Sequence, residues 1–277
     1  MTASAQAALR TQVVEYKQGD AVLEGYLAYD DAIQGKRPGV LVVHEWKGLD
    51  AYAKGRAEQL AKLGYVAFAV DMYGKGIRPD NPKDAAAQTA IYRGNRQLMR
   101  DRVRAGLEVL QKNPLASPEK IAAIGYCFGG GVVLELARSG APVTGVVSFH
   151  GNLDTPNPAD AKNIKAKVLV LHGAIDPLVP PEQIAGFEQE MNAAKVDWQL
   201  VSYGNAVHGF TNPASGNDPS QRVAYNPLAD RRSFAAMMQF FGEIFQKKPI
   251  ARPDRPSGLM RPRPGKPIPR LDAPGTR

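Results

Sequence analysis

The sequence predicts an α/β fold with a mostly parallel central sheet and helices on both of its faces. Short continuous apolar runs recur along the chain, as expected of strands that are covered on both faces. They are "RPGVLVVHE" at 37–45, "YVAFAVD" at 65–71, "KIAAIGY" at 120–126, "TGVVSFH" at 144–150 and "AKVLVLHG" at 166–173. Stretches with helical spacing separate these runs, and strands that alternate with helices build parallel sheets.

The first element is predicted to be an antiparallel hairpin. Residues 12–30, "QVVEYKQGDAVLEGYLAYD", alternate polar and apolar side chains around a turn at Gln18, Gly19 and Asp20. A further strand is expected at 197–203, "DWQLVSY". Helices are expected at Asp50–Leu63, Lys83–Gln111, Gly130–Arg138, Pro181–Ala194 and Ala229–Phe245. No composition break interrupts these elements, so residues 1–246 are predicted to form one domain.

Residues 247–277 differ in composition from the rest of the chain. They hold nine Lys or Arg against two Asp, which leaves +1 of the net charge of +8 to residues 1–246, and eight of the 22 prolines. Proline at this density cannot propagate helix or sheet ladders, and little apolar surface is present to offset the entropy of ordering. A disordered, basic, proline-rich tail is predicted. Contact with an acidic surface stays open for it, but nucleic acid is not an expected partner.

Composition also limits the class of protein. One cysteine excludes an internal disulfide and a CxxC redox pair, and argues against a site built from several thiolates. No apolar run reaches the roughly 18 residues that a membrane span needs, so no membrane is expected. The opening "MTASAQAALR" lacks the basic and apolar regions of a signal peptide, although "ASAQA" resembles the end of one. We expect a cytoplasmic protein. The alternative is a periplasmic one whose leader has been removed.

The single cysteine lies in a pattern that presents nucleophiles. Residues 125–129 read G-x-C-x-G, the strand-to-helix elbow G-x-S-x-G with sulfur in place of oxygen. The elbow strains its central residue, and the glycines allow strand and helix to approach it closely. Cys127 would then stand near the positive end of a helix, which favours a thiolate. The alternative is a buried cysteine that serves as a small hydrophobe.

A thiol nucleophile needs a base, and the chain has four histidines. In this architecture the order along the chain is nucleophile, acid, histidine. Asp176 follows the strand at 166–173, and His208 lies in a loop after the last strand. Asp176 would fix the imidazole tautomer, while His208 would transfer the proton. The other candidates either end strands or follow no buried strand: His44, His150, His172, Asp197 and Asp218.

An oxyanion hole would complete such a site. The backbone N–H of Phe128 is one candidate donor, and a residue after the strand at 37–45 would supply the second. Glu45 ends that strand. A buried charge is costly unless it is paired, so its carboxyl either faces solvent or meets a partner in the site. The residues alone leave both possibilities open.

Five ordered motifs resemble the dienelactone hydrolase (carboxymethylenebutenolidase) family. They are "VVHEWKGL" at 42–49, "DMYGKG" at 71–76, "GYCFGGG" at 125–131, "HGAIDPLVP" at 172–180 and "AVHGFTNP" at 206–213, within a resemblance from about residue 12 to residue 246. The resemblance implies an α/β-hydrolase fold and a Cys–His–Asp triad that matches Cys127, His208 and Asp176. It implies no metal and no organic cofactor.

The same resemblance implies roles for three further residues. Glu45 would pair with the resting thiol and take part in generating the thiolate, and the backbone of Trp46 and Phe128 would form the oxyanion hole. Two family arginines that hold a substrate carboxylate are replaced here by Lys75 and Asn212. Lysine lacks the bidentate fork and asparagine lacks the charge. Lys75 stays a candidate for substrate binding, with Arg78 as a possible substitute.

The sequence therefore predicts a hydrolase of a small ester or lactone, acting through a thioester at Cys127, as a monomer or small homo-oligomer. A second interpretation is a thiol-based redox sensor on a hydrolase fold. A third is a non-catalytic interaction protein that uses its basic tail.

Overall fold

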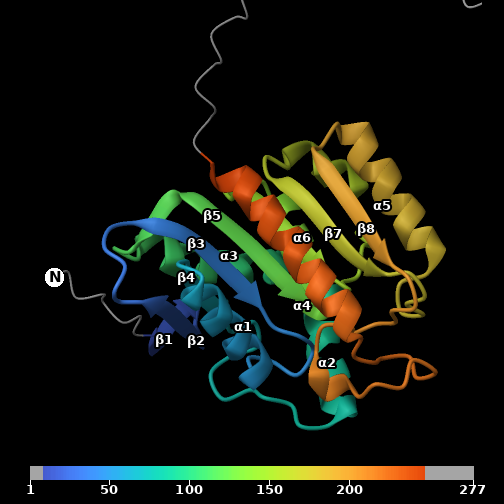
Figure 1. Ribbon diagram of the computed structural model, residues 1–277, viewed down its shortest axis with the longest axis horizontal. Helices are drawn as coiled ribbons and strands as arrows, with labels where there is room; N and C mark the ends of the chain where they lie inside the picture. The colour runs from blue at the N-terminus through green and yellow to red at the C-terminus, as the bar shows by residue number, and fades with distance from the viewer. Residues whose placement is uncertain (1–8, 247–277) are drawn as a thin grey trace, which may run out of the picture. The chain divides into compact units, whose positions relative to one another are not determined.

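Eight strands form one sheet in the computed structural model, which describes residues 9–246 (Figure 1). In sheet order they are β1 (Leu9–Gln18), β2 (Ala21–Asp30), β4 (Val66–Val70), β3 (Arg37–Val43), β5 (Ala116–Tyr126), β6 (Gly145–Phe149), β7 (Lys167–Gly173) and β8 (Trp198–Tyr203). β2 is antiparallel to β1 and β4, and every other neighbouring pair is parallel. The predicted hairpin is confirmed, and Gly19 in its turn has a φ of 56°. The predicted disordered tail lies outside the described residues.

The helices follow the strands in the predicted alternation. They are α1 (Ala51–Lys62), α2 (Pro82–Gly94), α3 (Arg96–Lys112), α4 (Phe128–Arg138), α5 (Pro181–Ala194) and α6 (Pro227–Phe245), with 3-10 turns η1 (Pro158–Asn163) and η2 (Pro213–Ser215). Strand order, parallel pairing and helix placement are those of the predicted α/β-hydrolase fold.

One predicted helix is wrong in its continuity. The stretch predicted as a single helix at Lys83–Gln111 is two helices, α2 and α3, which are broken at Asn95. The backbone of Asn95 is not helical (φ −132°, ψ 85°), and its side chain accepts a hydrogen bond from Leu98 N at 3.0 Å. An asparagine that caps a new first turn starts a helix in a new direction, and the preceding Gly94 weakens the old one.

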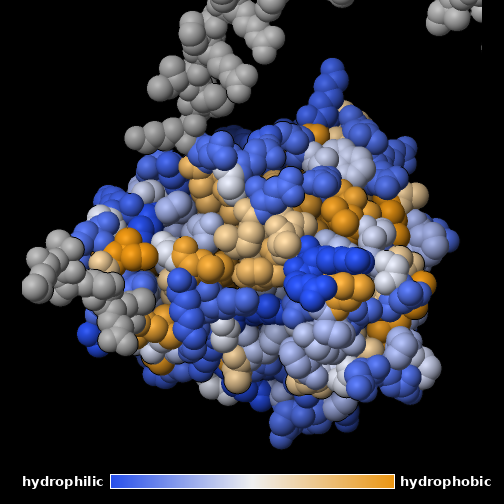
Figure 2. All heavy atoms as spheres, in the orientation of Figure 1, coloured by the Kyte–Doolittle hydropathy of each residue, from blue (hydrophilic) through white to orange (hydrophobic). Residues whose placement is uncertain are grey.

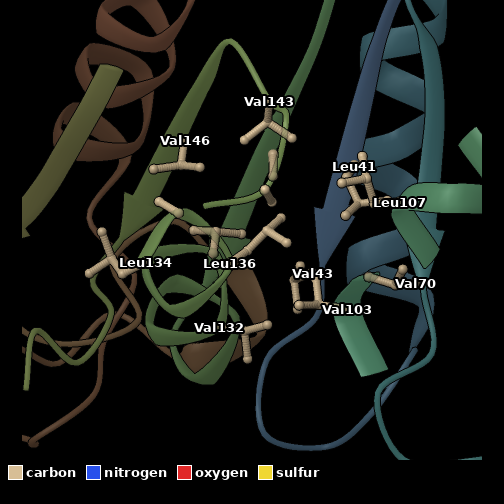
Figure 3. Packing of buried hydrophobic residues seen from close by; sticks show 14 of the residues in the cluster. Leu41, Val43, Val70, Val103, Leu107, Val132, Leu134, Leu136, Val143 and Val146 are labelled. Atoms are coloured by element: carbon tan, nitrogen blue, oxygen red, sulfur yellow. The ribbon is translucent and has the colours of Figure 1, made fainter. Parts of the chain in front are cut away.

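Alternation along β3 explains why its sequence is apolar without interruption. Leu41 and Val43 point to one face of the sheet, where they join a core with α3, α4 and α5. Val40 and Val42 point to the other face and pack into a core with α1 and α6. All four side chains are fully buried. Figure 3 shows the first of these cores, to which β3, α3 and α4 contribute most of the labelled side chains.

The described residues form one compact unit that ends at Phe245. On the face that Figure 2 shows, polar and charged residues surround smaller groups of apolar ones. Among residues 9–246, no helix is both long enough and apolar enough to cross a membrane. The parallel strands β3, β5, β6 and β7 all end at the same edge of the sheet, and this edge positions the site described below.

Candidate active site

A pocket of about 530 Å³ opens beside the start of α4. Five of the seven predicted site residues line it: Glu45, Trp46, Cys127, Phe128 and His208. Asp176 lies behind His208, and Lys75 lies elsewhere. Within residues 9–246, no group of three or more His, Cys, Asp or Glu side chains is arranged to hold a metal ion.

The backbone at Cys127 has the strained geometry that its motif predicts. The residue lies between β5 and α4 with φ 53° and ψ −115°, and its side chain is half-buried. A Cβ on Gly125 would lie 2.0 Å from Gly129 O, and one on Gly129 would lie 2.4 Å from Val43 O. Both contacts are with backbone, which cannot move aside. The two glycines are therefore required for strand, helix and elbow to pack together.

Asp176 and His208 form a buried pair. His208 Nδ1 donates to Asp176 Oδ2 at 2.8 Å, while Asp176 Oδ1 accepts from Leu178 N at 2.8 Å. The carboxylate is thereby fixed in the loop after β7, and the histidine is fixed in the tautomer that keeps Nε2 free of its proton when the ring is neutral. Nε2 is buried and has no hydrogen-bond partner among the described residues.

The pKa of His208 reflects two opposing influences. Burial disfavours the imidazolium, but the Cys127 sulfur and the Asp176 carboxylate outweigh burial and raise the pKa of His208 to about 10. An imidazole in this setting holds a proton readily while the sulfur beside it is negative. The arrangement can therefore carry a thiolate–imidazolium pair.

The carboxyl group of Glu45 is buried and meets a partner in the site, so it does not face solvent. Asn212 Nδ2 donates to Glu45 Oε2 at 2.6 Å. The orientation of this amide is fixed, since its Oδ1 accepts from Ala214 N at 3.0 Å. Burial is the main cause that raises the pKa of Glu45 to about 7, against the opposing hydrogen bond from Asn212. The carboxyl group can therefore exchange a proton near neutral pH.

Trp46 and Phe128, whose backbone N–H groups are the candidates for an oxyanion hole, both line the pocket. Phe128 is the first residue of α4, so its N–H has no partner within the helix. On the other side, His44 Nδ1 donates to Glu45 O, which fixes the peptide plane that also holds the N–H of Trp46. His44 Nε2 accepts from Met72 N at 3.2 Å, and burial lowers the pKa of His44 to about 4, so the ring is neutral.

Two polar residues outside the predicted set adjoin the elbow. His150 directly follows β6 and accepts a hydrogen bond from Cys127 N, and Thr211 bonds to the other ring nitrogen of His150. The sequence carries a signal for His150, because "SFHG" places a histidine at the end of a buried strand next to the elbow strand. It carries none for Thr211.

The structure separates Lys75 from the pocket. Its ammonium group is half-exposed and pairs with Glu15 Oε2 on β1 at 2.5 Å. Arg78, the suggested substitute, donates to the carbonyl groups of Leu49, Gly74 and Ile77 and contacts Asp71. Both cations are occupied by neighbours away from Cys127. We therefore leave Lys75 out of the proposed substrate site, as a correction to the sequence-based expectation.

The sequence is similar to that of known proteins over most of its length. The model of the "Dienelactone hydrolase family" matches residues 23–245. "Protein usf" of Aquifex pyrophilus is 27% identical over 237 residues, which cover 84% of this chain and 98% of that protein. A Bradyrhizobium protein named "Probable 2-oxo-3-(5-oxofuran-2-ylidene)propanoate lactonase" is 28% identical over 218 residues, 74% of this chain and 84% of that one.

Among solved structures, a dienelactone hydrolase-like promiscuous phosphotriesterase from metagenomic libraries is similar over 86% of this chain and 100% of its own, with 41% identity and a TM-score of 0.82. A dienelactone hydrolase structure from Klebsiella pneumoniae has a TM-score of 0.72 at 20% identity, a likeness of fold alone.

Proposed function

Since the chain belongs to the dienelactone hydrolase family and is a hydrolase, we propose that it cleaves small esters or lactones through a thioester at Cys127. One observation carries the proposal: the strained elbow presents Cys127 to the pocket that His208 also lines, with Asp176 bonded to the far nitrogen of that histidine. Cys127, Asp176 and His208 come from three separate parts of the sequence.

The proposed acylation step uses three groups. The Cys127 thiolate attacks the carbonyl carbon, a C–S bond forms, and the carbonyl electron pair moves to oxygen. The N–H groups of Trp46 and Phe128 stabilise this oxyanion. When the intermediate collapses, the C–O bond to the alcohol breaks, and His208 Nε2 gives its proton to the departing oxygen. In a lactone the alcohol stays attached to the acyl group.

Deacylation reverses these roles. Water gives a proton to His208 Nε2 as its oxygen attacks the thioester carbon, and the C–S bond breaks to release the acid. The proton returns to the Cys127–His208 pair, which closes the cycle without a net change in the protein. Asp176 holds the imidazole throughout and stabilises its charged form.

Glu45 is proposed to share in generating the thiolate. It lines the same pocket as Cys127, and its pKa of about 7 suits exchange of a proton with the thiol at neutral pH. Its carboxylate form would accept the thiol proton when substrate binds.

The pocket favours substrates without a charge close to the reacting carbonyl. The buried side chains of Asn212 and Glu45 line the pocket, so an anion beside them would meet an amide and an acid in place of a cation. Apart from the His208 imidazolium, which the thiolate neutralises, the cations that line the pocket are the exposed Lys47 and Arg93. We propose neutral short esters and lactones as the substrate class. The 41% identical solved structure is a promiscuous phosphotriesterase, so hydrolysis of neutral phosphotriesters is a second candidate activity.

The test is a matched panel of substrates with wild type and Cys127→Ala. The panel holds p-nitrophenyl acetate, a lactone, the same ester with a carboxylate beside the carbonyl, and a neutral p-nitrophenyl phosphotriester. We expect wild type to prefer the neutral ester in kcat/KM, and Cys127→Ala to lose at least about 10³-fold in kcat. Full activity in Cys127→Ala would remove the cysteine from the chemistry.

The same variants address the two alternatives from the sequence. Reversible oxidation of Cys127 by peroxide, found by mass spectrometry in a protein without esterase turnover, would support a redox sensor. Function that is lost on deletion of residues 247–277 and kept in Cys127→Ala would support an interaction protein.

A further inference from the structure

We propose that His150 is a positioning residue that ties the backbone of Cys127 to the loop carrying His208. The inference rests on the proposed thiol mechanism and adds to it a residue that fixes the position of Cys127 relative to His208. His150 itself would not touch the substrate, because it does not line the pocket.

The two nitrogens of the His150 ring make two different bonds. Cys127 N–H donates to His150 Nδ1 at 3.2 Å and also to Phe149 O at 3.0 Å. His150 Nε2 lies 2.7 Å from Thr211 Oγ1. A backbone N–H can only donate, so Nδ1 is the acceptor and Nε2 carries the proton that is donated to Thr211. One neutral tautomer satisfies both bonds.

Burial keeps the ring in that neutral form. The His150 side chain is 1% exposed, and burial, together with the neighbouring His208, lowers its pKa well below the ordinary value. The rings of His150 and His208 lie edge to face, with centroids 5.2 Å apart. A neutral histidine in this place does not repel the imidazolium that the mechanism forms on His208.

Thr211 is itself firmly held, so the bond from His150 reaches a fixed point. It is fully buried, Tyr52 OH lies 2.6 Å from its Oγ1, and Arg56 Nη2 donates to its carbonyl oxygen at 2.8 Å. Thr211 lies three residues after His208 in the same loop. The path from Cys127 N through His150 to Thr211 therefore links the backbone of the nucleophile to the loop that carries His208.

Backbone strain indicates that the histidine side chain is needed. His150 has a φ of 38°, in the region that glycine adopts readily and that other residues adopt at an energetic cost, although histidine occurs there more often than most. A glycine at this position would relieve the strain, although it would lose more backbone entropy on folding. Cys127 and His150 therefore both have strained backbones in one place. Such strain is typical of functional sites, where the contacts of the surrounding structure hold a residue in a costly conformation.

The experiment separates the two bonds with conservative variants. In His150→Asn the side-chain oxygen can replace Nδ1, and asparagine tolerates positive φ, but it cannot reach Thr211. Thr211→Val removes the same link from the other end while it keeps the shape of the side chain. Thr211→Ser restores the hydroxyl. Thr144→Val is the matched control, since it makes the same substitution at a half-buried threonine whose hydroxyl bonds to Ile121 O and which does not line the pocket.

Three readouts distinguish positioning from mere support of the fold. They are kcat and KM for p-nitrophenyl acetate, melting temperature, and the rate at which iodoacetamide alkylates Cys127 across pH, which reports on one thiol because the chain has a single cysteine. We expect His150→Asn and Thr211→Val each to lose about 10- to 100-fold in kcat, with KM within about twofold, and to shift the alkylation profile. The double variant should lose no more than either single one, and Thr211→Ser and the control Thr144→Val should stay near wild type.

Wild-type kcat in a folded His150→Asn, or losses that multiply in the double variant, would overturn the proposal. If His150→Asn does not fold, equal kcat in Thr211→Val and Thr211→Ser would overturn it as well. These failures are separate from that of the proposed function, which Cys127→Ala tests: a dead Cys127→Ala beside fully active His150 and Thr211 variants refutes only the positioning role.

Discussion

The two ends of α4 each meet a buried cluster of polar side chains, and the two clusters differ in how fully their charges are paired. In the last turn, Arg138 is 1% exposed and donates to both oxygens of Glu190, at 2.8 and 2.7 Å. It also donates to Glu135 at 3.1 Å and to Leu153 O at 3.0 Å. Glu135 in turn pairs with Arg100 at 2.7 Å.

At the first turn the pairing is incomplete. His208 Nε2 has no hydrogen-bond partner among the described residues, and the pKa of Glu45 is raised to about 7, mainly by burial. A closed cluster such as that around Arg138 fixes α3, α4 and α5 to one another. A cluster that holds an unpartnered nitrogen and a carboxyl group with a raised pKa can exchange protons with a substrate. The contrast separates the structural charges of this protein from the charges proposed to be chemical.

Among changes that compare the two clusters, Asp176→Asn is expected to have the largest effect, and that effect is on kcat. Asparagine keeps the shape of the side chain but no longer holds the imidazole in its productive tautomer or stabilises its cation. We expect kcat for p-nitrophenyl acetate to fall about 10⁴-fold, with little change in melting temperature. Asp218→Asn is the matched control, because Asp218 is exposed and bonds only to Ser220 and Gln221. A loss in Asp176→Asn no greater than in the control would contradict the assignment.

Arg138→Met should have the opposite profile. Removing one partner of a buried cluster leaves uncompensated carboxylates, so the free energy of unfolding should fall by about 3 to 5 kcal/mol. The folded fraction should keep its kcat. Urea unfolding followed by circular dichroism measures the first quantity, and assays at low temperature measure the second. Lys112→Met, in an exposed pair with Glu108, should show no measurable change. A kcat loss in folded Arg138→Met would break the comparison.

Glu45→Gln is expected to affect activity and stability in opposite directions. A neutral amide cannot take the thiol proton, so kcat should fall about 10²-fold, and any rise of activity through about pH 7 should disappear. A pH profile of kcat/KM for both proteins tests this. An unchanged profile would mean that the titration of Glu45 plays no part in the reaction.

The sign of the stability effect follows from the raised pKa. Between the ordinary carboxyl value of 4.5 and about 7, the folded protein binds a proton at Glu45 that the unfolded chain does not. Wild type should therefore lose about 3 kcal/mol of stability relative to Glu45→Gln as the pH rises through this window, and the gap should stay constant above it. Urea unfolding at pH 4 and pH 8 measures the gap. A gap that does not grow with pH would contradict the burial of an ionisable carboxyl.

The smallest effect is expected from Lys75→Ala. Its ammonium group pairs with Glu15 on the surface and does not line the pocket. kcat/KM should stay within about twofold for neutral and carboxylate-bearing esters alike. A selective loss on the carboxylate-bearing ester would return Lys75 to the substrate site.

Much of this arrangement could be predicted from the sequence, for reasons that particular residues make clear. Strands such as β3 are continuous apolar runs in the sequence because both of their faces are buried. The elbow can be recognised in the sequence because any side chain at its two glycines would collide with backbone atoms. The order of Cys127, Asp176 and His208 follows the order of the strands that carry them. Backbone and burial leave traces in local sequence.

The rest depends on contacts between distant residues, which leave no local trace. The break between α2 and α3 has a local signal in Asn95, but the pairing of Glu45 with Asn212 joins positions 167 residues apart. The bond from His150 to Thr211 spans 61 residues. Lys75 was misplaced because its position in a motif says nothing of Glu15, its partner on β1.

The central claim, that Cys127 forms a covalent thioester, can be tested by one measurement. Wild type is mixed with excess p-nitrophenyl acetate, quenched in acid during the first turnovers, and digested for mass spectrometry. We predict an acetyl group on the peptide that contains Cys127, formed as fast as p-nitrophenol is released, and no adduct in Cys127→Ala. Two results would contradict the account. One is wild-type turnover with the acetyl group on a residue other than Cys127, and the other is a Cys127→Ala variant that keeps its activity without forming an adduct.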